Sequence, residues 1–174
     1  MPAILSRTRA AGRSISCDPN LRPSLWRSTE EMRRVLNELA IQTDLVFLGL
    51  AEGVTLTGFD APERIAPFYL DRAVRLVAVK LGARGARLFT STQREMLPAF
   101  PVLLADTVGA GDGFAAGMIS GMLDGLALPS CMERGNALGA LAVTAQGDQE
   151  GLPTREAPTR FLATARILRR SGES

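Results

Sequence analysis

Continuous apolar runs alternate with helical patterns in the first half of the chain, and this alternation constrains the fold more than any other feature. Residues 44–48 and 76–79 form short apolar runs, which are typical of strands buried on both faces of a sheet. Apolar residues recur at helical spacing in 28–43 and from about 62 to 73, and an extended run at 14–17 precedes them. The order predicts an α/β fold with a parallel sheet flanked by helices.

The second half of the chain continues this pattern and then becomes helical. A tight turn at 82–85 leads into a strand at 86–90, and residues 94–97 are expected to pair with that strand as a hairpin. A last strand is expected at 102–105. Helical spacing then dominates almost to the end, with one helix expected around 131–145.

Length and composition limit the class of protein. With 174 residues, 46% of them hydrophobic and 22% charged, the chain is predicted to form one domain, residues 1–174. The net charge of +2 is spread along the chain, so no nucleic-acid partner is expected. The charge-free stretches are too short to span a membrane, and the N-terminal segment lacks the apolar core of a signal peptide.

The absence of histidine excludes two common kinds of site. Neither a Cys/His zinc site nor a Ser/His/Asp triad can be built. Cys17 and Cys131 have no metal-ligand spacing and are expected to be reduced thiols of a cytoplasmic protein. A parallel sheet would normally have strands before residue 14, so the helix expected at 2–11 suggests that the chain is the C-terminal portion of something larger.

A glycine-punctuated turn, Asp106 to Gly113, runs directly into a helix of small residues. Unpaired backbone N–H groups and the positive end of the helix dipole favour an anion at such a position. Asp112 is then unusual, because a carboxylate there repels phosphate. One function that would explain its presence is to take the proton from an attacking hydroxyl. The alternative is that Asp112 caps the helix. The Walker pattern and the G-x-G-x-x-G fingerprint are both absent.

Polar side chains gather where the predicted strands end. Asp18, Asn20 and Arg22 follow the first strand, Glu52 follows the second, and Lys80, the only lysine of the chain, ends the third. The glycine turn follows the expected last strand. Because ligands of doubly wound sheets bind beyond the carboxyl ends of the strands, these residues are expected to form one site.

The glycine turn resembles the signature of the ribokinase-like (PfkB) carbohydrate kinases. Residues 79–86 are similar to the nucleotide-side strand and turn of that family. Residues 18–26 and 150–154 resemble the subgroup that phosphorylates 2-keto-3-deoxygluconate and related sugar acids. The resemblance covers nearly the whole chain, and it implies a ribokinase-like fold that lacks the N-terminal strands and the lid.

The resemblance implies a role for each matching residue. Asp112 would be the general base that deprotonates the sugar hydroxyl, and the N–H groups of Gly109, Ala110 and Gly111 would bind the transferring phosphoryl group. The other implied contacts are with ATP for Lys80, Gly82, Gly85, Asn136 and Ala140, with the sugar for Asn20 and Arg22 as well as Asp112, with Mg²⁺ indirectly for Glu52, and with a monovalent cation such as K⁺ for Asp106 and Thr107.

Several of these residues have structural alternatives. The Arg22 guanidinium suits the carboxylate of a sugar acid, and the alternative is a surface arginine in a proline-bracketed loop. Lys80 could form an ion pair at its strand end, Asn136 could be an ordinary polar residue of its helix, and Asp106 could cap the turn. The family often has asparagine three positions before Glu52, where this chain has Gly49.

The sequence thus predicts an ATP-dependent kinase for 2-keto-3-deoxygluconate or a related sugar acid. One alternative is a non-catalytic nucleotide-binding domain, or one subunit of a split kinase whose partner chain carries the missing N-terminal half. Another is a kinase with fructokinase-like specificity. Apart from that partner chain, the expected partners are the sugar, ATP and further copies of the chain in a homo-oligomer.

Overall fold

The computed structural model describes residues 2–147, 153–154 and 156–171. The chain divides into two compact units. The first comprises residues 1–81 and 87–95, and the second comprises residues 82–86 and 96–174. No helix within the described ranges has the length and apolar character needed to cross a membrane.

A five-stranded sheet in the order β1-β2-β3-β4-β5 organises the first unit. Strands β1 (Ser16–Cys17), β2 (Leu45–Gly49) and β3 (Leu76–Lys80) are parallel, as the sequence predicts, and Gly49 lies opposite Lys80. Strands β4 (Ala86–Phe89) and β5 (Arg94–Leu97) follow as neighbours, and the hairpin turn is closed by a bond from the Thr90 N–H to the Gln93 carbonyl.

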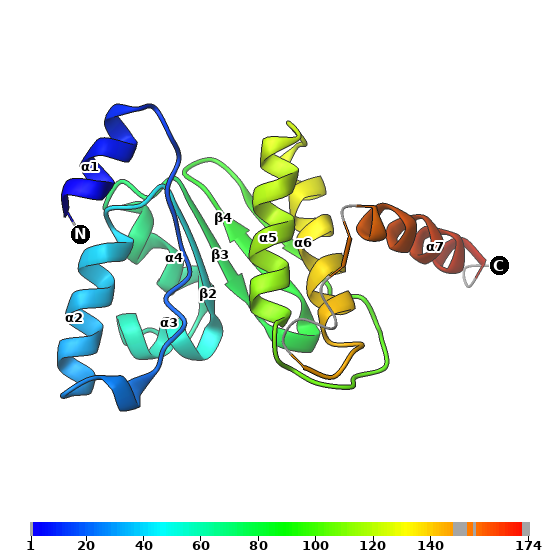
Figure 1. Ribbon diagram of the computed structural model, residues 1–174, viewed down its shortest axis with the longest axis horizontal. Coiled ribbons are helices and arrows are strands. Elements are labelled where there is room, and N and C mark those ends of the chain that lie inside the picture. Colours follow the sequence, from blue (N-terminus) through cyan, green and yellow to red (C-terminus); the bar gives the residue numbers. More distant parts are fainter. Residues whose placement is uncertain (1, 148–152, 155, 172–174) are drawn as a thin grey trace. The chain divides into compact units, whose positions relative to one another are not determined.

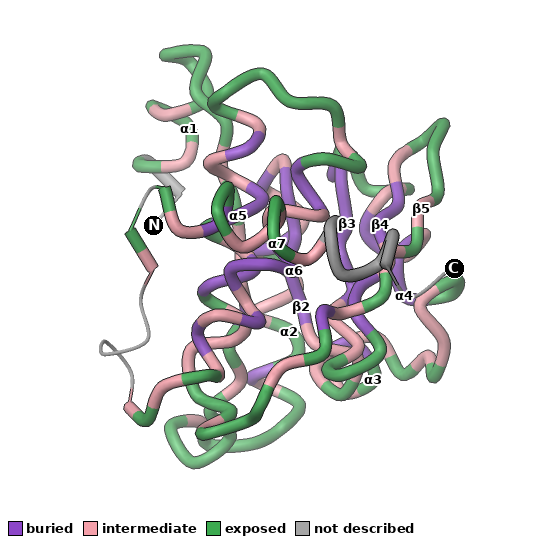
Figure 2. The backbone as a smooth tube through the Cα atoms, turned by 90° about the vertical axis from the view of Figure 1, so that its right-hand side faces the viewer, coloured by how far each residue is buried: buried purple, intermediate pink, exposed green. Residues whose placement is uncertain are grey.

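Four helices belong to the first unit: α1 (Pro2–Ala10), α2 (Thr29–Ala40), α3 (Leu50–Thr57) and α4 (Pro62–Leu70). Helices α3 and α4 contact β2 and β3, and α2 contacts α3 (Figure 1). Residues 45–48 of β2 and 76–79 of β3 are apolar and buried, and Figure 2 shows both strands as buried. The core of this unit comprises, among others, Val46, Leu48, Ile65, Tyr69, Val77, Val79 and Phe89.

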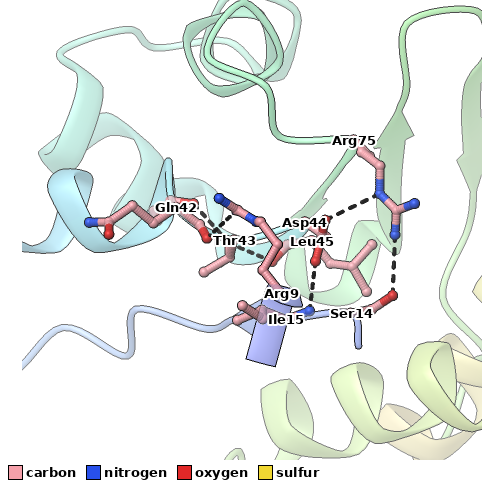
Figure 3. Close-up of polar contacts among 9 residues, drawn as sticks. Arg9, Ser14, Ile15, Gln42, Thr43, Asp44, Leu45 and Arg75 are labelled. Carbon is pink, nitrogen blue, oxygen red and sulfur yellow. Dashed lines mark hydrogen bonds and ion pairs between the residues drawn. The ribbon is translucent and has the colours of Figure 1, made fainter. Parts of the chain in front are cut away.

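Asp44 holds the start of β1 beside β2. Its carboxylate accepts the Ile15 N–H at 2.8 Å and pairs with Arg75 at 3.4 Å (Figure 3). Arg75 also donates to the Ser14 hydroxyl at 3.2 Å. These contacts fix the amino ends of the first strands. The polar residues that follow β1 and β2 therefore lie at the other end of these parallel strands, the carboxyl end.

The second unit is built around helices α5 (Ala110–Leu123) and α6 (Leu128–Ala142), which pack side by side (Figure 1). Their contact is close because glycines face it. A Cβ on Gly117 would lie 2.6 Å from the Cα of Gly135. Helix α7 (Ala157–Ser171) packs on α6 through Phe161 and Leu162.

The structure differs from the sequence-based expectations in several places, and helix α6 begins and ends three residues earlier than the expected 131–145. Residues 50–57, for which no helix was predicted, form α3. Residues 102–105 do not form the expected last strand, because the Ala105 N–H donates to the Val143 carbonyl and Leu103 is 92% exposed. Helix α4 ends at Leu70 rather than near residue 73, where Ala73 adopts a left-handed φ of 71° that is incompatible with a continuing helix.

Candidate functional site

Two groups of residues predicted from the sequence lie at element ends, one in each unit. The first, called here the strand-end cluster, consists of Asp18, Asn20, Arg22, Glu52 and Lys80 in the first unit. The second is the glycine turn, residues 106–112, in the second unit. The contacts within each group determine what its side chains can do.

Lys80 and Asp18 form an ion pair in the strand-end cluster. Their Nζ and Oδ2 atoms are 2.6 Å apart, and the side chains are 17% and 21% exposed. The pair brings the end of β3 to the loop that follows β1. This is the ion pair that the sequence left open as an alternative for Lys80, and it does not test a contact with ATP.

Glu52 connects the start of α3 to the same loop. One carboxylate oxygen accepts the Gly49 N–H at 2.7 Å and the other accepts the Leu21 N–H at 3.0 Å. No sequence pattern indicates the Leu21 contact. The Gly49 contact has a recognisable local signal, a glutamate at the third helical position that returns to the N-cap residue.

Asn20 and Arg22 lie on the exposed side of this loop. Asn20 has a positive φ of 43°, which is uncommon for a residue other than glycine. Nη1 of Arg22 donates to Asn20 Oδ1 at 2.5 Å and to the Leu21 carbonyl at 3.1 Å. Within the described residues, the Nε–Nη2 edge of Arg22 makes no hydrogen bond or ion pair, and a guanidinium edge of this kind binds carboxylates side-on.

Cys17 lies directly before the loop and is a poor nucleophile. Burial raises the pKa of its thiol to about 11, and the charges of Asp18 and Glu52 act in the same direction. Both cysteines of the chain are free.

The glycine turn leads into α5 without a side-chain cap. Gly109 is the N-cap residue and has a left-handed φ of 78°, a conformation that glycine adopts without strain. Asp112 is therefore the third helical residue and not the cap that the sequence allowed as an alternative. Its carboxylate is exposed and makes no hydrogen bond or ion pair within the described part of the chain. The first N–H groups of α5 are available to an anion beside it.

Asp106 shapes the start of the glycine turn. Its carboxylate accepts the N–H groups of Thr107 at 2.6 Å, Val108 at 3.2 Å and Gly147 at 3.4 Å. The bonds from Val108, Gly147 and Thr107 lower the pKa of Asp106. The role in capping the turn is thus present, and the sequence did not indicate the contact with Gly147.

Two of the residues predicted to contact the nucleotide, Gly85 and Asn136, meet at one backbone segment of the second unit. Asn136 is buried and donates through Nδ2 to the carbonyls of Leu97 at 3.2 Å and Pro98 at 3.0 Å. A Cβ on Gly85 would lie 2.0 Å from the same Leu97 carbonyl, so the close approach requires glycine. Ala140 is buried beside Phe100 and Ala137. Gly82 has a φ of 62° and accepts the Gly85 N–H in the intervening turn.

The sequence profile of the pfkB family of carbohydrate kinases matches residues 2–155. The chain belongs to this family. It is 49% identical over 166 residues to the 2-dehydro-3-deoxygluconokinase of Bacillus subtilis (strain 168), a match that covers 95% of this chain and 51% of that protein. The pfkB family resemblance read from the glycine turn is confirmed.

Solved structures of related kinases share the fold. An E. coli protein assigned as a ribokinase II, in complex with ATP and Mg²⁺, is 31% identical with a TM-score of 0.84, and the match covers 92% of this chain and 52% of that one. A Vibrio cholerae O395 fructokinase double mutant bound to fructose, ADP and potassium is 28% identical with a TM-score of 0.84, over 92% of this chain and 54% of that one. The ribokinase-like fold is confirmed, and the chain spans about half the length of the relatives it matches.

Proposed function

We propose that this chain is the ATP-binding and catalytic portion, one α/β domain, of a kinase that phosphorylates 2-keto-3-deoxygluconate or a related sugar acid. The observation that carries the proposal is the state of Asp112. An exposed carboxylate stands in the first turn of α5, does not cap the helix, and lies beside N–H groups that favour an anion.

These groups suit transfer of the γ-phosphoryl group. The sugar hydroxyl oxygen forms a bond to the γ-phosphorus as the bond to the ADP oxygen breaks, and the hydroxyl proton passes to the Asp112 carboxylate. The N–H groups of Gly109, Ala110 and Gly111 stabilise the charge on the phosphoryl oxygens. Asp112 also orients the hydroxyl, which makes it a substrate-binding residue.

The strand-end cluster supports an acidic substrate. The open Nε–Nη2 edge of Arg22 matches a carboxylate, and Asn20 fixes the other side of that guanidinium. The identity of 49% to the 2-dehydro-3-deoxygluconokinase of B. subtilis supports the same substrate class.

ATP would contact Gly82, Gly85, Asn136 and Ala140, and Lys80 would add a positive charge near its phosphates. Among the described residues, no three acidic or thiol side chains lie close enough together to hold a metal directly. Mg²⁺ would instead enter the site bound to the phosphates of ATP. Glu52 would hold this ion only through water, because both of its oxygens already accept N–H groups. Mg²⁺ supplies neutralisation of phosphate charge.

A monovalent cation such as K⁺ would bind at Asp106 and Thr107, where the lowered pKa keeps the Asp106 carboxylate charged. Replacing K⁺ in the assay buffer by tetramethylammonium, at constant ionic strength, tests this part of the proposal. We place the protein in the cytoplasm, where ATP is available and both thiols stay reduced.

Substitution of Asp112 tests the catalytic assignment. In Asp112→Asn, coupled ADP release with 2-keto-3-deoxygluconate should fall by a factor of at least about 10², because the amide cannot accept the proton. The variant should still bind ATP, as measured by calorimetry. Asp60→Asn, an exposed aspartate outside both groups, is the matched control. Unchanged turnover in Asp112→Asn would refute the assignment.

Two alternatives have their own tests. For fructokinase-like specificity, Arg22→Ala is assayed on acidic and neutral sugars, and an equal effect on both removes the carboxylate argument. For a non-catalytic domain or a split kinase, which would assemble with other chains, the chain is mixed with an N-terminal fragment of a relative. Restored activity supports a split kinase, and no activity supports a non-catalytic domain.

A further inference from the structure

The Glu52 carboxylate binds two segments that are far apart in the sequence. Oε2 accepts the N–H of Gly49 at the start of α3, and Oε1 accepts the N–H of Leu21 in the loop after β1. The two distances, 2.7 Å and 3.0 Å, are those of charge-assisted hydrogen bonds. A single side chain therefore ties the loop to the end of β2.

Leu21 lies between the two residues that are proposed to meet the sugar acid. Its neighbours are Asn20, whose positive φ of 43° must be held by the surroundings, and Arg22, whose guanidinium folds back onto the Leu21 carbonyl. The N–H of Leu21 goes to Glu52 and its C=O goes to Arg22. The direction of the Leu21 peptide units thus sets where the Arg22 guanidinium is placed.

The loop has a second anchor at its other end. Asp18 is paired with Lys80 at 2.6 Å, and the buried Pro19 fixes one backbone angle between the two anchors. The Lys80 contact holds the start of the loop, and the Glu52 contact is the one that reaches the Asn20–Arg22 segment. Loss of Glu52 would therefore free that segment while leaving the first anchor in place.

Gly49 makes room for this arrangement. A Cβ at Gly49 would lie 3.2 Å from Glu52 Oε2, which is closer than most side chains approach one another. Gly49 stands where the family often has asparagine. Because Gly49 has no side chain, the Glu52 carboxylate has room to accept the Gly49 N–H.

We propose that Glu52 is a positioning residue for substrate specificity: by holding the Leu21 N–H, it presents Asn20 and Arg22 to the carboxylate of a sugar acid. This inference rests on the proposed function. It differs from a metal role, because the effect passes through the loop and falls on acidic substrates.

The test is the ratio of kcat/KM for 2-keto-3-deoxygluconate to that for fructose, in wild type and in Glu52→Gln. Glutamine has one carbonyl oxygen and a donating NH₂ group, so it cannot accept both N–H groups. We expect the ratio to fall by about tenfold, through a higher KM for the sugar acid. Loss of the water-mediated Mg²⁺ contact of Glu52 would affect both sugars alike, so it cancels in this ratio.

Glu31→Gln is the matched control, because Glu31 is also a glutamate at the third position of a helix, α2, and its side chain makes no hydrogen bond or ion pair within the residues that the structure describes. Glu52→Asp keeps the charge with a shorter side chain and should give an intermediate ratio. Should Glu52→Gln prove too unstable to assay, Glu52→Asp carries the same comparison. Hydrogen exchange at the Leu21 amide should accelerate in both Glu52 variants and not in Glu31→Gln.

The outcomes separate the two proposals. Equal losses on both sugars, or a change confined to the Mg²⁺ requirement, would overturn the positioning role while leaving an active, acid-selective kinase. A wild-type protein that phosphorylates neither sugar, or an Asp112→Asn variant with unchanged turnover, would refute the proposed function itself.

Discussion

The Lys80 ammonium lies 2.6 Å from the Asp18 carboxylate, although the two residues lie at the ends of strands that are not neighbours. Asp18 follows β1, Lys80 ends β3, and β2 lies between them in the sheet. The residue opposite Lys80 in β2 is Gly49, which has no side chain. The ion pair therefore joins the first and third strand ends across the second.

Removing the cation should destabilise the fold. In Lys80→Met, the Asp18 carboxylate stays partly buried without its ammonium partner, and we expect a loss of about 1–3 kcal/mol in the free energy of unfolding. Urea denaturation measures it. Arg34→Met is the matched control, since the Arg34–Glu38 pair is 63% and 57% exposed and should be worth under about 0.5 kcal/mol. Equal losses in the two variants would contradict the prediction.

A methyl group on Gly117 should also destabilise the chain, despite improving helix propensity. A Cβ there would lie 2.6 Å from the Cα of Gly135 and 2.7 Å from the Arg134 carbonyl, and backbone atoms cannot move aside easily. We expect Gly117→Ala to cost about 1–3 kcal/mol in thermal or urea unfolding. Ala116→Gly, at the adjacent exposed position, should cost about 1 kcal/mol from propensity alone. If helix propensity alone decided both results, Gly117→Ala would raise the free energy of unfolding and Ala116→Gly would lower it.

Tyr69 should contribute through its hydroxyl as well as its ring. The Tyr69 hydroxyl donates to Asn37 Oδ1 at 2.9 Å, and Asn37 Nδ2 donates to the Leu56 carbonyl at 2.9 Å, which links α4, α2 and α3. Burial raises the pKa of Tyr69, so the hydroxyl stays protonated and able to donate. Tyr69→Phe should cost about 1–2 kcal/mol. A double-mutant cycle with Asn37→Ala should be non-additive, and strict additivity would show that the bond contributes nothing.

Cys17 should react slowly with disulfide reagents. The thiolate is the reactive form, and a pKa of about 11 leaves the thiol protonated at neutral pH. In Cys131→Ala, where Cys17 is alone, the rate of thionitrobenzoate release should rise with pH up to about 11 and should increase in Asp18→Asn. The same variant in concentrated guanidinium provides the fully reactive reference. Rapid reaction of the folded protein near neutral pH would contradict the raised pKa.

Local patterns predicted much of the fold but not helix α3. The buried strands and the helix after the glycine turn follow from apolar spacing. Residues 50–57 contain Gly53 and β-branched residues, which helix propensity disfavours. The helix forms because Glu52 caps its start and because Gly53 packs closely on Leu48 and Ile65, where a Cβ would lie 2.7 Å and 2.8 Å from their side chains. Such tertiary contacts are not visible in a local window.

The candidate site could likewise be predicted only in part. Its residue types could be predicted, since carboxylates, an arginine and glycines at strand and helix ends suit phosphoryl transfer. The contacts that orient them could not, because Glu52–Leu21 and Asp106–Gly147 join residues 31 and 41 positions apart. The expected strand at 102–105 was wrong for a related reason. An apolar run forms a strand only when a neighbouring strand pairs with it, and this pairing is not visible in a local window.

Lys80 is the only lysine in the sequence, and it is paired within the strand-end cluster. Reductive methylation with ¹³C-formaldehyde would therefore place a single labelled side-chain amine in the spectrum, at the point where the loop after β1 meets β3. Its chemical shift and titration would report directly on whether Asp18 is still engaged when a ligand is added. The composition of the chain thus provides a site-specific NMR probe without any substitution.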